Sequence, residues 1–516
     1  MRTRSKAFKV WRKLNKLEGV IPEGLTQVKM KNLTDWDRKY LNSNNISIPD
    51  LRQNSAKYFM TEDGIELNEF NNNSDAESRK IDFADWAIRM YAQIIREGFI
   101  RAICPFTGEM MTSNCSIPFG SHYSRNHLRM CAYRFESNEV FYIITGQLWN
   151  EKIGVYFPQS ETFVHVGNRV IDKETIQRLI RQFKSFQVKY EEELITYLGK
   201  TEKSLSMIMA YPTNYYHYLC NGLTGLYYLS RHNVLSSMKS ISVAAFEFFG
   251  SMKSIFPDFD GEILEGNVED MEVQVLRDNK FVIGPSHILL DKAFIDNLKS
   301  KLIESVDQSV QDSISQSYAD AELKIGIYIK VNRRVWVEQE SGIAEIINAL
   351  SKQYGKIHVV FTGFTFPATL AGDEKDRLKT HYQGLYQEEQ DLVDKIMNGV
   401  QASGKVSHTS LIGETMNVVT AWVDGIDYYI SPGGVGMVPF TLICNKPGIF
   451  HCNRQVLEMP LKNRPYCFER EDLVMPLFLE KEKVTDLIDD ETGDHHSNSY
   501  SCDWNSIYEL TQKLIS

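Results

Sequence analysis

Apolar positions along this chain follow two alternating patterns from residue 172 to the end. Short runs of consecutive apolar residues, typical of buried strands, alternate with stretches in which apolar residues return every three or four positions, as in amphipathic helices. Strands and helices that alternate at this spacing form parallel sheets, so the pattern predicts an α/β fold. The predicted strands span residues 204–210, 241–246, 281–283, 323–329, 356–361 and 426–430. The predicted helices span residues 172–200, 215–229, 293–304, 342–353, 388–400, 418–425 and 504–515.

The first 170 residues have a different character. Short β-rich runs between residues 99 and 166 are separated by Gly, Pro, Asn and Ser, which predicts a small antiparallel module. Apolar residues at helical spacing predict one helix over residues 6–17 and another over residues 81–98. Stretches rich in Asn and Ser at residues 42–47 and 68–78 predict polar connectors.

A chain of 516 residues is too long for one hydrophobic core, so several domains are expected. Residues 305–317 are rich in Ser, Gln and Asp and predict a polar linker between two α/β halves. The predicted divisions are 1–80 (basic helix and polar connectors), 81–170 (helix and β-rich module), 171–315 (first α/β half) and 316–516 (second α/β half).

Composition narrows the class of protein. The hydrophobic content of 43% and charged content of 24% are those of a soluble globular protein. The net charge of −10 argues against a nucleic-acid partner. The eight cysteines include no C-x-x-C pair, which favours free thiols in a reducing compartment. No apolar stretch is long enough to span a bilayer and no signal peptide is recognisable, so a cytoplasmic location is expected.

The helix predicted over residues 6–17 combines an apolar face carrying Phe8 and Trp11 with a strongly basic opposite face. Such a helix suits an anionic membrane surface or an acidic partner. The alternative is a terminal helix that packs on its own domain and leaves its basic face in water. The first interpretation predicts peripheral attachment at the inner face of the membrane.

The most informative stretch spans residues 430–440, a glycine-rich turn between a short apolar strand and a predicted helix start. Glycines let the backbone approach a phosphate, and free N–H groups at a helix start point toward it. The turn therefore predicts an anion-binding cradle. The alternative is a tight turn between a strand and a helix that holds no ligand.

Three motifs in their order along the chain resemble a glycosyltransferase family. They are Tyr-Tyr-His-Tyr-Leu at 215–219, Arg333-Arg334 followed by Glu340, and Ser-Pro-Gly-Gly-Val-Gly-Met at 431–437. Over residues 205–452 they resemble the GT-B-fold family of EGF-domain O-GlcNAc transferases and plant xylosyltransferases, although Gly433 stands where the family turn has histidine. Bacterial capsule and lipopolysaccharide transferases of GT-B type, including Kdo transferases, fit the layout equally well. The resemblance implies two Rossmann-like domains, the first for the acceptor and the second for a nucleotide sugar.

Under this resemblance the second domain binds the donor. The backbone of the glycine turn admits the phosphates, and the adjacent arginines neutralise them, since guanidinium suits bidentate phosphate contact. Glu414, just before a predicted helix, is a candidate for binding a ribose or sugar hydroxyl, the alternative being an ordinary helix-start carboxylate. The donor-binding candidates are Arg333, Arg334, Glu414, Gly433, Gly434, Val435 and Gly436. No cofactor is expected beyond the nucleotide sugar, which is a substrate.

His217 is the candidate general base, because a transferase must remove a proton from the acceptor hydroxyl. The alternative is a histidine packed among the neighbouring tyrosines. The Asp258-Phe259-Asp260 triplet imitates the pair of aspartates that holds a divalent metal in GT-A transferases, but the flanking Pro and Gly favour a surface turn. Asp260 is therefore a secondary candidate base, and no divalent metal is expected. A zinc site among Cys104, Cys115, His122, His127 and Cys131 is disfavoured, because only His127 and Cys131 are closely spaced.

The leading hypothesis is a glycosyltransferase that moves a sugar from a nucleotide-sugar donor to a glycan or glycoconjugate acceptor, in surface polysaccharide or glycoprotein synthesis. One alternative is a metal-dependent GT-A transferase that uses Asp258 and Asp260. The other is a non-enzymatic scaffold of a glycan-assembly complex. The donor sugar, the acceptor and the stereochemistry do not follow from the sequence.

Overall fold

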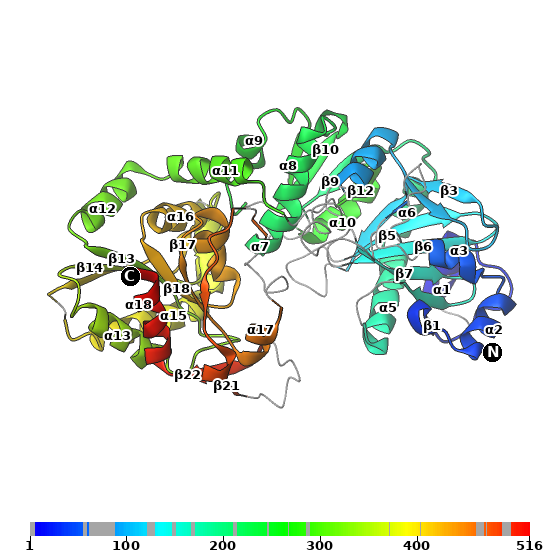
Figure 1. Ribbon diagram of the computed structural model, residues 1–516. Helices are drawn as coiled ribbons and strands as arrows, with labels where there is room; N and C mark the ends of the chain where they lie inside the picture. Colours follow the sequence, from blue (N-terminus) through cyan, green and yellow to red (C-terminus); the bar gives the residue numbers. More distant parts are fainter. Residues whose placement is uncertain are drawn as a thin grey trace. The chain divides into compact units, whose positions relative to one another are not determined.

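The computed structural model describes residues 6–54, 59–60, 88–120, 130–146, 151–166, 171–209, 214–244, 247–266, 268–284, 289–370, 372–402, 404–460, 469–470, 472–487 and 497–515. The chain divides into two compact units (Figure 1). Unit 1 comprises Met1–Ala245 and Pro257–Ile288, and unit 2 comprises Phe246–Phe256 and Leu289–Ser516. The sequence placed the boundary between the α/β halves at residue 315, whereas the compact units divide at residue 288.

Unit 1 contains the predicted antiparallel module, enlarged by a strand from far upstream. The six-stranded sheet has the order β1-β8-β7-β6-β5-β4. All neighbouring strands are antiparallel except β1 and β8, which are parallel. The strands are β1 (Thr26–Lys29), β4 (Ser116–Phe119), β5 (Met130–Glu136), β6 (Val140–Gly146), β7 (Glu151–Phe157) and β8 (Thr162–His165). Smaller elements of this part are α2 (Asp35–Ser43), α3 (Ile48–Gln53) and the hairpin of β2 (Ile100–Ile103) and β3 (Met110–Ser113).

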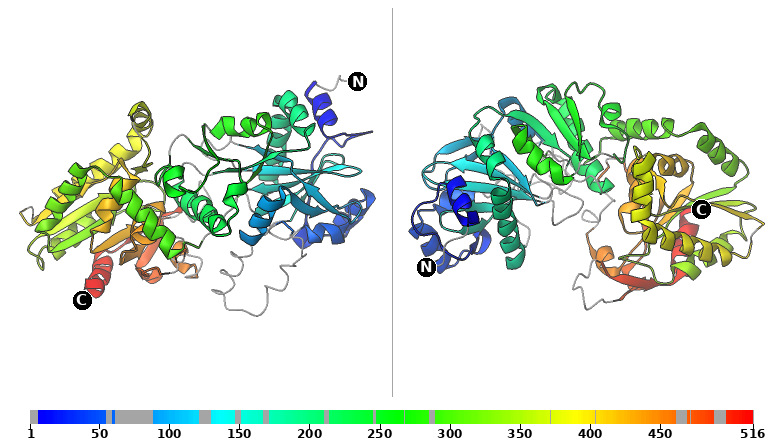
Figure 2. Two further views of the ribbon diagram at one scale, coloured as in Figure 1. Left: turned by 90° about the horizontal axis from the view of Figure 1, so that it is seen from above. Right: turned by 180° about the vertical axis from the view of Figure 1, so that it is seen from behind.

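Helices α1 (Lys6–Leu14) and α5 (Lys173–Lys189) lie against this sheet (Figure 2), and α6 (Glu191–Leu198) joins them in the same core. Trp11 of α1 is only 3% exposed and packs into the core of the sheet, with Lys184 Nζ 4.3 Å from its ring centre. The apolar face of α1 is therefore buried in its own unit, while Lys9 and Lys13 remain exposed. The helix thus packs on its own domain and leaves its basic face in water, while contact of that face with a membrane surface or an acidic partner stays a prediction.

The second sheet of unit 1 is parallel, as the apolar runs predicted. Its order is β11-β10-β9-β12. Strand β9 is therefore central, with β10 and then β11 on one side and β12 on the other. The strands are β9 (Ser204–Ile208), β10 (Ser240–Ala244), β11 (Glu262–Gly266) and β12 (Lys280–Ile283). The helical segments between them are α7 (Tyr215–His217), a π-helical turn at Tyr218–Leu223, α8 (Thr224–Arg231) and α10 (Val268–Arg277).

Unit 2 is built on a six-stranded parallel sheet with the order β16-β14-β13-β18-β19-β20. Numbered along the chain within this sheet, the order is 3-2-1-4-5-6, which is the strand order of the Rossmann fold. The strands are β13 (Leu323–Tyr328), β14 (Ile357–Thr362), β16 (Val406–Ser410), β18 (Tyr428–Pro432), β19 (Gly448–His451) and β20 (Leu477–Phe478). The order reverses between β13 and β18, and ligands of such sheets bind at the carboxyl ends of the strands at this switch point.

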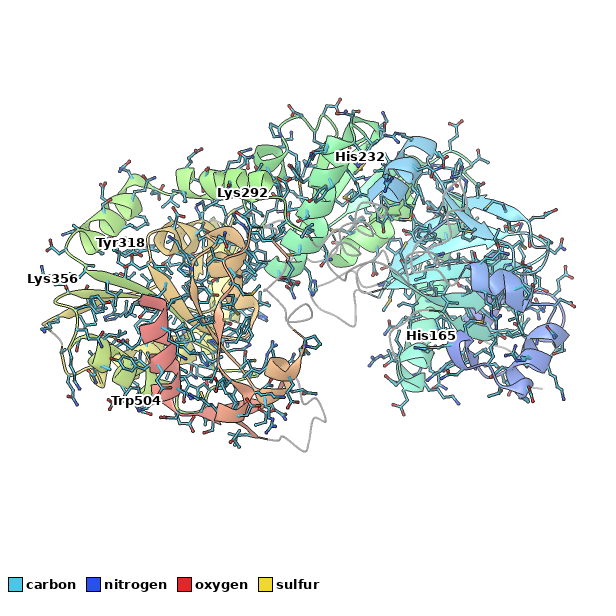
Figure 3. All side chains as sticks on the ribbon, in the orientation of Figure 1. His165, His232, Lys292, Tyr318, Lys356 and Trp504 are labelled. Carbon is cyan, nitrogen blue, oxygen red and sulfur yellow. The ribbon has the colours of Figure 1, made fainter. Side chains whose placement is uncertain are left out.

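Helices surround the sheet of unit 2 (Figure 1). They are α9 (Met252–Ile255), α11 (Lys292–Glu304), α12 (Gln308–Ala319), α13 (Gln339–Leu350), α14 (Gly372–His381), α15 (Gln383–Asn398), α16 (Met416–Asp424), α17 (Arg454–Glu458) and α18 (Trp504–Ile515). Trp504 begins α18 (Figure 3). Two small strand pairs complete the unit, β15 (Thr365–Phe366) with β17 (Glu414–Thr415) and β21 (Val484–Leu487) with β22 (Ser499–Cys502).

The linker predicted over residues 305–317 is wrong, because most of it forms helix α12. None of the residues of this helix is buried, so it lacks the apolar face by which a helix is recognised in a sequence. Side-chain bonds one turn apart support it, such as that from Gln308 Nε2 to Asp312 Oδ1 at 2.9 Å. At its end the Tyr318 hydroxyl donates to the Trp422 carbonyl of α16 at 2.7 Å, which ties the polar helix to unit 2.

Candidate functional site

The switch point of unit 2 brings two of the sequence motifs to one edge of the sheet. The loop that carries Arg333 and Arg334 follows β13, and the glycine-rich turn follows β18. These two strands are direct neighbours, with Ile327 paired to Ile430 near their carboxyl ends. The structure therefore places the predicted arginines and glycines at the edge of the sheet where Rossmann-type sheets bind their ligands.

The three glycines of the turn have different reasons to be glycine. A Cβ at Gly436 would lie within 2.6 Å of three carbons of the Tyr328 ring, and one at Gly433 would lie 2.8 Å from Cys452 Sγ. Packing against protein groups therefore explains these two positions. A Cβ at Gly434 would instead lie 2.9 Å from Lys330 Nζ, a flexible charged group. Gly434 is therefore the position at which the glycine turn lies against the Lys330 ammonium.

Lys330, which sequence reasoning missed, is the central group of this site. It is 7% exposed, and among the described residues its ammonium has neither a hydrogen bond nor an ion pair. Burial, and next the charge of Arg334, lower its pKa to about 7. Its position two residues after the apolar strand β13 was the available signal, since carboxyl-end residues line the crevice.

The two arginines lie in a strained loop. Both adopt left-handed backbone conformations, with φ of 48° at Arg333 and 54° at Arg334. This conformation costs a non-glycine residue about 1–2 kcal/mol. Arg333 is exposed, whereas Arg334 is half-buried and its Nε is a buried donor without a partner. Consecutive strained residues with an unpaired buried donor are typical of ligand-binding loops.

A returning segment near the C-terminus holds this loop in place. The Arg334 N–H donates to the Ser497 carbonyl at 2.9 Å, and the Tyr500 N–H donates to the Val335 carbonyl at 2.9 Å. The Tyr500 hydroxyl also lies 2.7 Å from His451 Nδ1, at the carboxyl end of β19. Burial lowers the pKa of His451 to about 3, so this histidine is a neutral structural group. No local feature of the sequence indicates this contact.

Glu389 of α15 is a second buried charge-bearing group near the crevice. It is 5% exposed, and its Oε2 accepts a hydrogen bond from the Phe364 N–H at 2.6 Å. Burial raises its pKa to about 7, opposed by that hydrogen bond and by the positive charge of Lys330. Nothing in its local sequence distinguishes it from the exposed acids of the same helix.

Glu414 lies at the same carboxyl edge but belongs to a different strand. It is half-buried in β17, where it pairs with Thr365, and it immediately precedes α16. The segment follows β16, the edge strand two positions from β13. The structure thus groups Glu414 with the edge strand and groups the arginines with Gly434 at the centre of the sheet.

In unit 1, His217 is the last residue of the short helix α7, which follows the carboxyl end of β9. It is half-buried, and its Nδ1 lies 2.8 Å from Asn221 Oδ1. An amide oxygen at this position requires the proton on Nδ1, so the neutral imidazole carries its lone pair on Nε2. This is the tautomer that a general base at Nε2 needs.

Asp258 and Asp260 are both exposed and lie in the turn before β11. This position is at the amino end of the strand, the edge opposite to the one at which His217 follows β9. Within the described residues there is no group of three His, Cys, Asp or Glu side chains that is suited to a metal ion. His122 and His127, considered for zinc, lie outside the described residues.

The cysteines of the described residues are all free thiols: Cys104, Cys115, Cys131, Cys220, Cys444, Cys452 and Cys502. Six of these seven are buried, as the sequence pattern suggested. Among the helices in the described part of the chain, none is both long and apolar enough to cross a lipid bilayer.

Comparisons with known proteins give distant structural similarities only. No protein-family model matches the chain, and no curated protein matches it. The solved structure of E. coli ADP-heptose LPS heptosyltransferase II overlaps 55% of this chain and 80% of its own, with 11% identity and a TM-score of 0.29. The GtfA/B complex overlaps 81% of this chain and 73% of its own, with 10% identity and a TM-score of 0.19. At such TM-scores these overlaps carry no weight, and the interpretation of the site depends on its own geometry.

Proposed function

We propose that this protein is a glycosyltransferase whose unit 2 binds the phosphates of a nucleotide-sugar donor at the switch point between β13 and β18. One observation carries the proposal. Lys330, a residue that is 7% exposed, has an ammonium without a hydrogen bond or ion pair among the described residues, and this ammonium lies against Gly434 at the carboxyl end of a sheet with Rossmann strand order. A buried cation without a protein partner is costly, and a bound anion supplies the missing partner.

The surrounding groups suit a phosphate in particular. Arg333 and Arg334 follow the same strand as Lys330 and add two donors with the planar geometry that phosphate oxygens accept. The backbone N–H groups of Gly434 and Val435 have no partner among the described residues and add two neutral donors.

The remaining roles extend the proposal to transfer itself. His217 of unit 1 is proposed to accept the proton of the acceptor hydroxyl at Nε2, because its tautomer leaves the lone pair there. Glu414 is proposed to accept a hydrogen bond from a ribose or sugar hydroxyl. The acceptor is proposed to be a glycan or glycoconjugate, and the buried free thiols favour a cytoplasmic location.

Thermal unfolding with a panel of nucleotides tests the donor site. The panel contains UDP, GDP, ADP and CMP with their common sugars. A ligand at about 100 times its dissociation constant stabilises the protein by about 2.7 kcal/mol, which raises the melting temperature visibly. Lys330→Met should abolish this rise. Lys324→Met is the matched control, because Lys324 is at the amino end of the same strand and pairs with Asp427 at 3.6 Å. No rise with any nucleotide would overturn the proposal and favour a scaffold.

Transfer of labelled sugar tests the catalytic role. His217→Ala should lower the rate by about 100-fold or more. His232 at the end of α8 (Figure 3) gives the matched control in the same unit, and His232→Ala should retain the rate. A chelator and Asp260→Asn should both be without effect. Loss of transfer both in the presence of a chelator and in Asp260→Asn would instead favour the metal-dependent alternative with Asp258 and Asp260.

A further inference from the structure

The amine of Lys330 is surrounded by groups from four elements of unit 2. The charges of Arg333 and Arg334 in the loop after β13 and of Glu389 on α15 act on the amine, as does the Cys452 thiol after β19. The fourth element is the glycine turn, which contributes backbone only, at Gly434. Within the described residues no carboxylate is within ion-pair distance of its Nζ.

Such surroundings disfavour a charged amine when the site holds no ligand. The residue is only 7% exposed, and the guanidinium groups of Arg333 and Arg334, which keep their protons at all physiological pH values, act against a further positive charge. Lysine, unlike arginine, loses its proton under these conditions. Burial lowers the pKa of Lys330 to about 7, so a large part of the amine is neutral near neutral pH.

A phosphate in the crevice reverses this balance. Its negative charge beside Gly434 favours the ammonium over the neutral amine, and the ammonium in turn donates hydrogen bonds to the phosphate oxygens. We propose that binding of a phosphate-bearing ligand to unit 2 is coupled to uptake of a proton from solution by the Lys330 amine, so that the affinity of the site falls as the pH rises above neutrality. This inference rests on the proposed function, since it requires the phosphate to lie beside Lys330.

Glu389 is the second titratable group whose charge acts on Lys330. Its carboxyl group is buried and its Oε2 accepts from the Phe364 N–H, so it is held near Lys330 rather than in solvent. A bound anion disfavours its ionised form, whereas a protonated Lys330 favours it, so the two influences on the pKa of Glu389 oppose each other. The two groups titrate as a coupled pair, and substitution of each separates their contributions.

Calorimetry measures the proton directly. The titrant is whichever of UDP-glucose, GDP-mannose and ADP-glucose stabilises the protein most, because the diphosphate of these compounds does not titrate near neutral pH. Titrations in buffers of different ionisation enthalpy at about pH 8 should show uptake of about 0.9 proton per site by Lys330. The dissociation constant should rise about eightfold between about pH 7.5 and pH 8.5. Lys330→Arg, which stays charged, should remove most of both effects, whereas Glu389→Gln should leave most of them.

A second titrant keeps the two proposals separate. Sulfate is a dianion between about pH 7.5 and pH 8.5. It should stabilise the wild type more than it stabilises Lys330→Met, and this difference should shrink as the pH rises. Nucleotide binding without proton uptake in the wild type would overturn the coupling and leave the proposed function intact. Sulfate stabilisation that fades only when Lys330 is present, without nucleotide binding, would support the coupling and overturn the proposed donor. If the dissociation constant of Lys330→Arg depended on pH as that of the wild type does, the coupling would also be refuted.

Discussion

Gly436→Ala tests whether the glycine turn is held by packing against Tyr328. The added methyl group would lie within 2.6 Å of three carbons of the Tyr328 ring, whereas carbon atoms in contact are normally about 3.5–4.0 Å apart. The ring or the turn must therefore move by about 1 Å, and overpacking of this kind costs about 1–3 kcal/mol. For a unit of this size, each kcal/mol lowers the melting temperature by about 2–4 °C.

The assay is thermal unfolding of the full chain, followed by a probe of unit 2 such as hydrogen exchange at β18. Gly434→Ala is the matched control, because its methyl would meet the flexible end of Lys330 and would lie 3.4 Å from the Tyr328 ring, an ordinary contact distance, so the stability should change by less than about 0.5 kcal/mol. In a Tyr328→Ala background the ring is absent, so Gly436→Ala should lose most of its effect. An equal loss of stability in both backgrounds would refute the explanation by packing.

Two further predictions concern the buried cores. Trp11→Ala should lower the unfolding free energy of unit 1 by about 3–5 kcal/mol, because the side chain is 3% exposed in the core, and a loss under about 1 kcal/mol in urea unfolding would contradict its burial. Burial lowers the pKa of His358 to about 4, whereas an unperturbed histidine has a pKa of about 6.5. Between these two pH values His358 is protonated in the unfolded chain and neutral in the folded chain. Stability is therefore complete above this window and falls by up to about 1.4 kcal/mol per unit as the pH drops through it. His358→Gln should flatten this dependence in melting curves recorded across the window, and an unchanged slope would contradict the assignment.

Much of the fold could be predicted because its signals are local. The parallel strands of both units are continuous apolar runs, and the helices between them, such as α11 and α13, carry an apolar face that repeats at helical spacing. The break of the helix predicted over residues 172–200 at Tyr190, and the polar helix α12, were missed because neither changes the local pattern of apolar residues.

The candidate site could be predicted only in part. The glycine turn and Arg333-Arg334 are recognisable because their residue types and their position after a strand indicate a phosphate-binding edge. Lys330 and Glu389 are ordinary charged residues in the sequence, and burial in the folded protein alone makes them unusual. The hydrogen bonds of Ser497 and Tyr500 to the arginine loop connect positions more than 160 residues apart in the sequence. A local sequence pattern cannot predict contacts at that separation.

The sequence by itself determined most of the strands and helices of the two α/β halves, and it placed the glycine turn and the arginines at strand ends, because periodicity and turn chemistry are properties of neighbouring residues. Tertiary structure alone decided that β13 lies beside β18, that β1 pairs with β8, and that α1 buries its tryptophan. It also decided the charge of Lys330. The physical reason is the same in each case: burial and strand pairing depend on groups that are distant along the chain, and an amine keeps or loses its proton according to what surrounds it after folding.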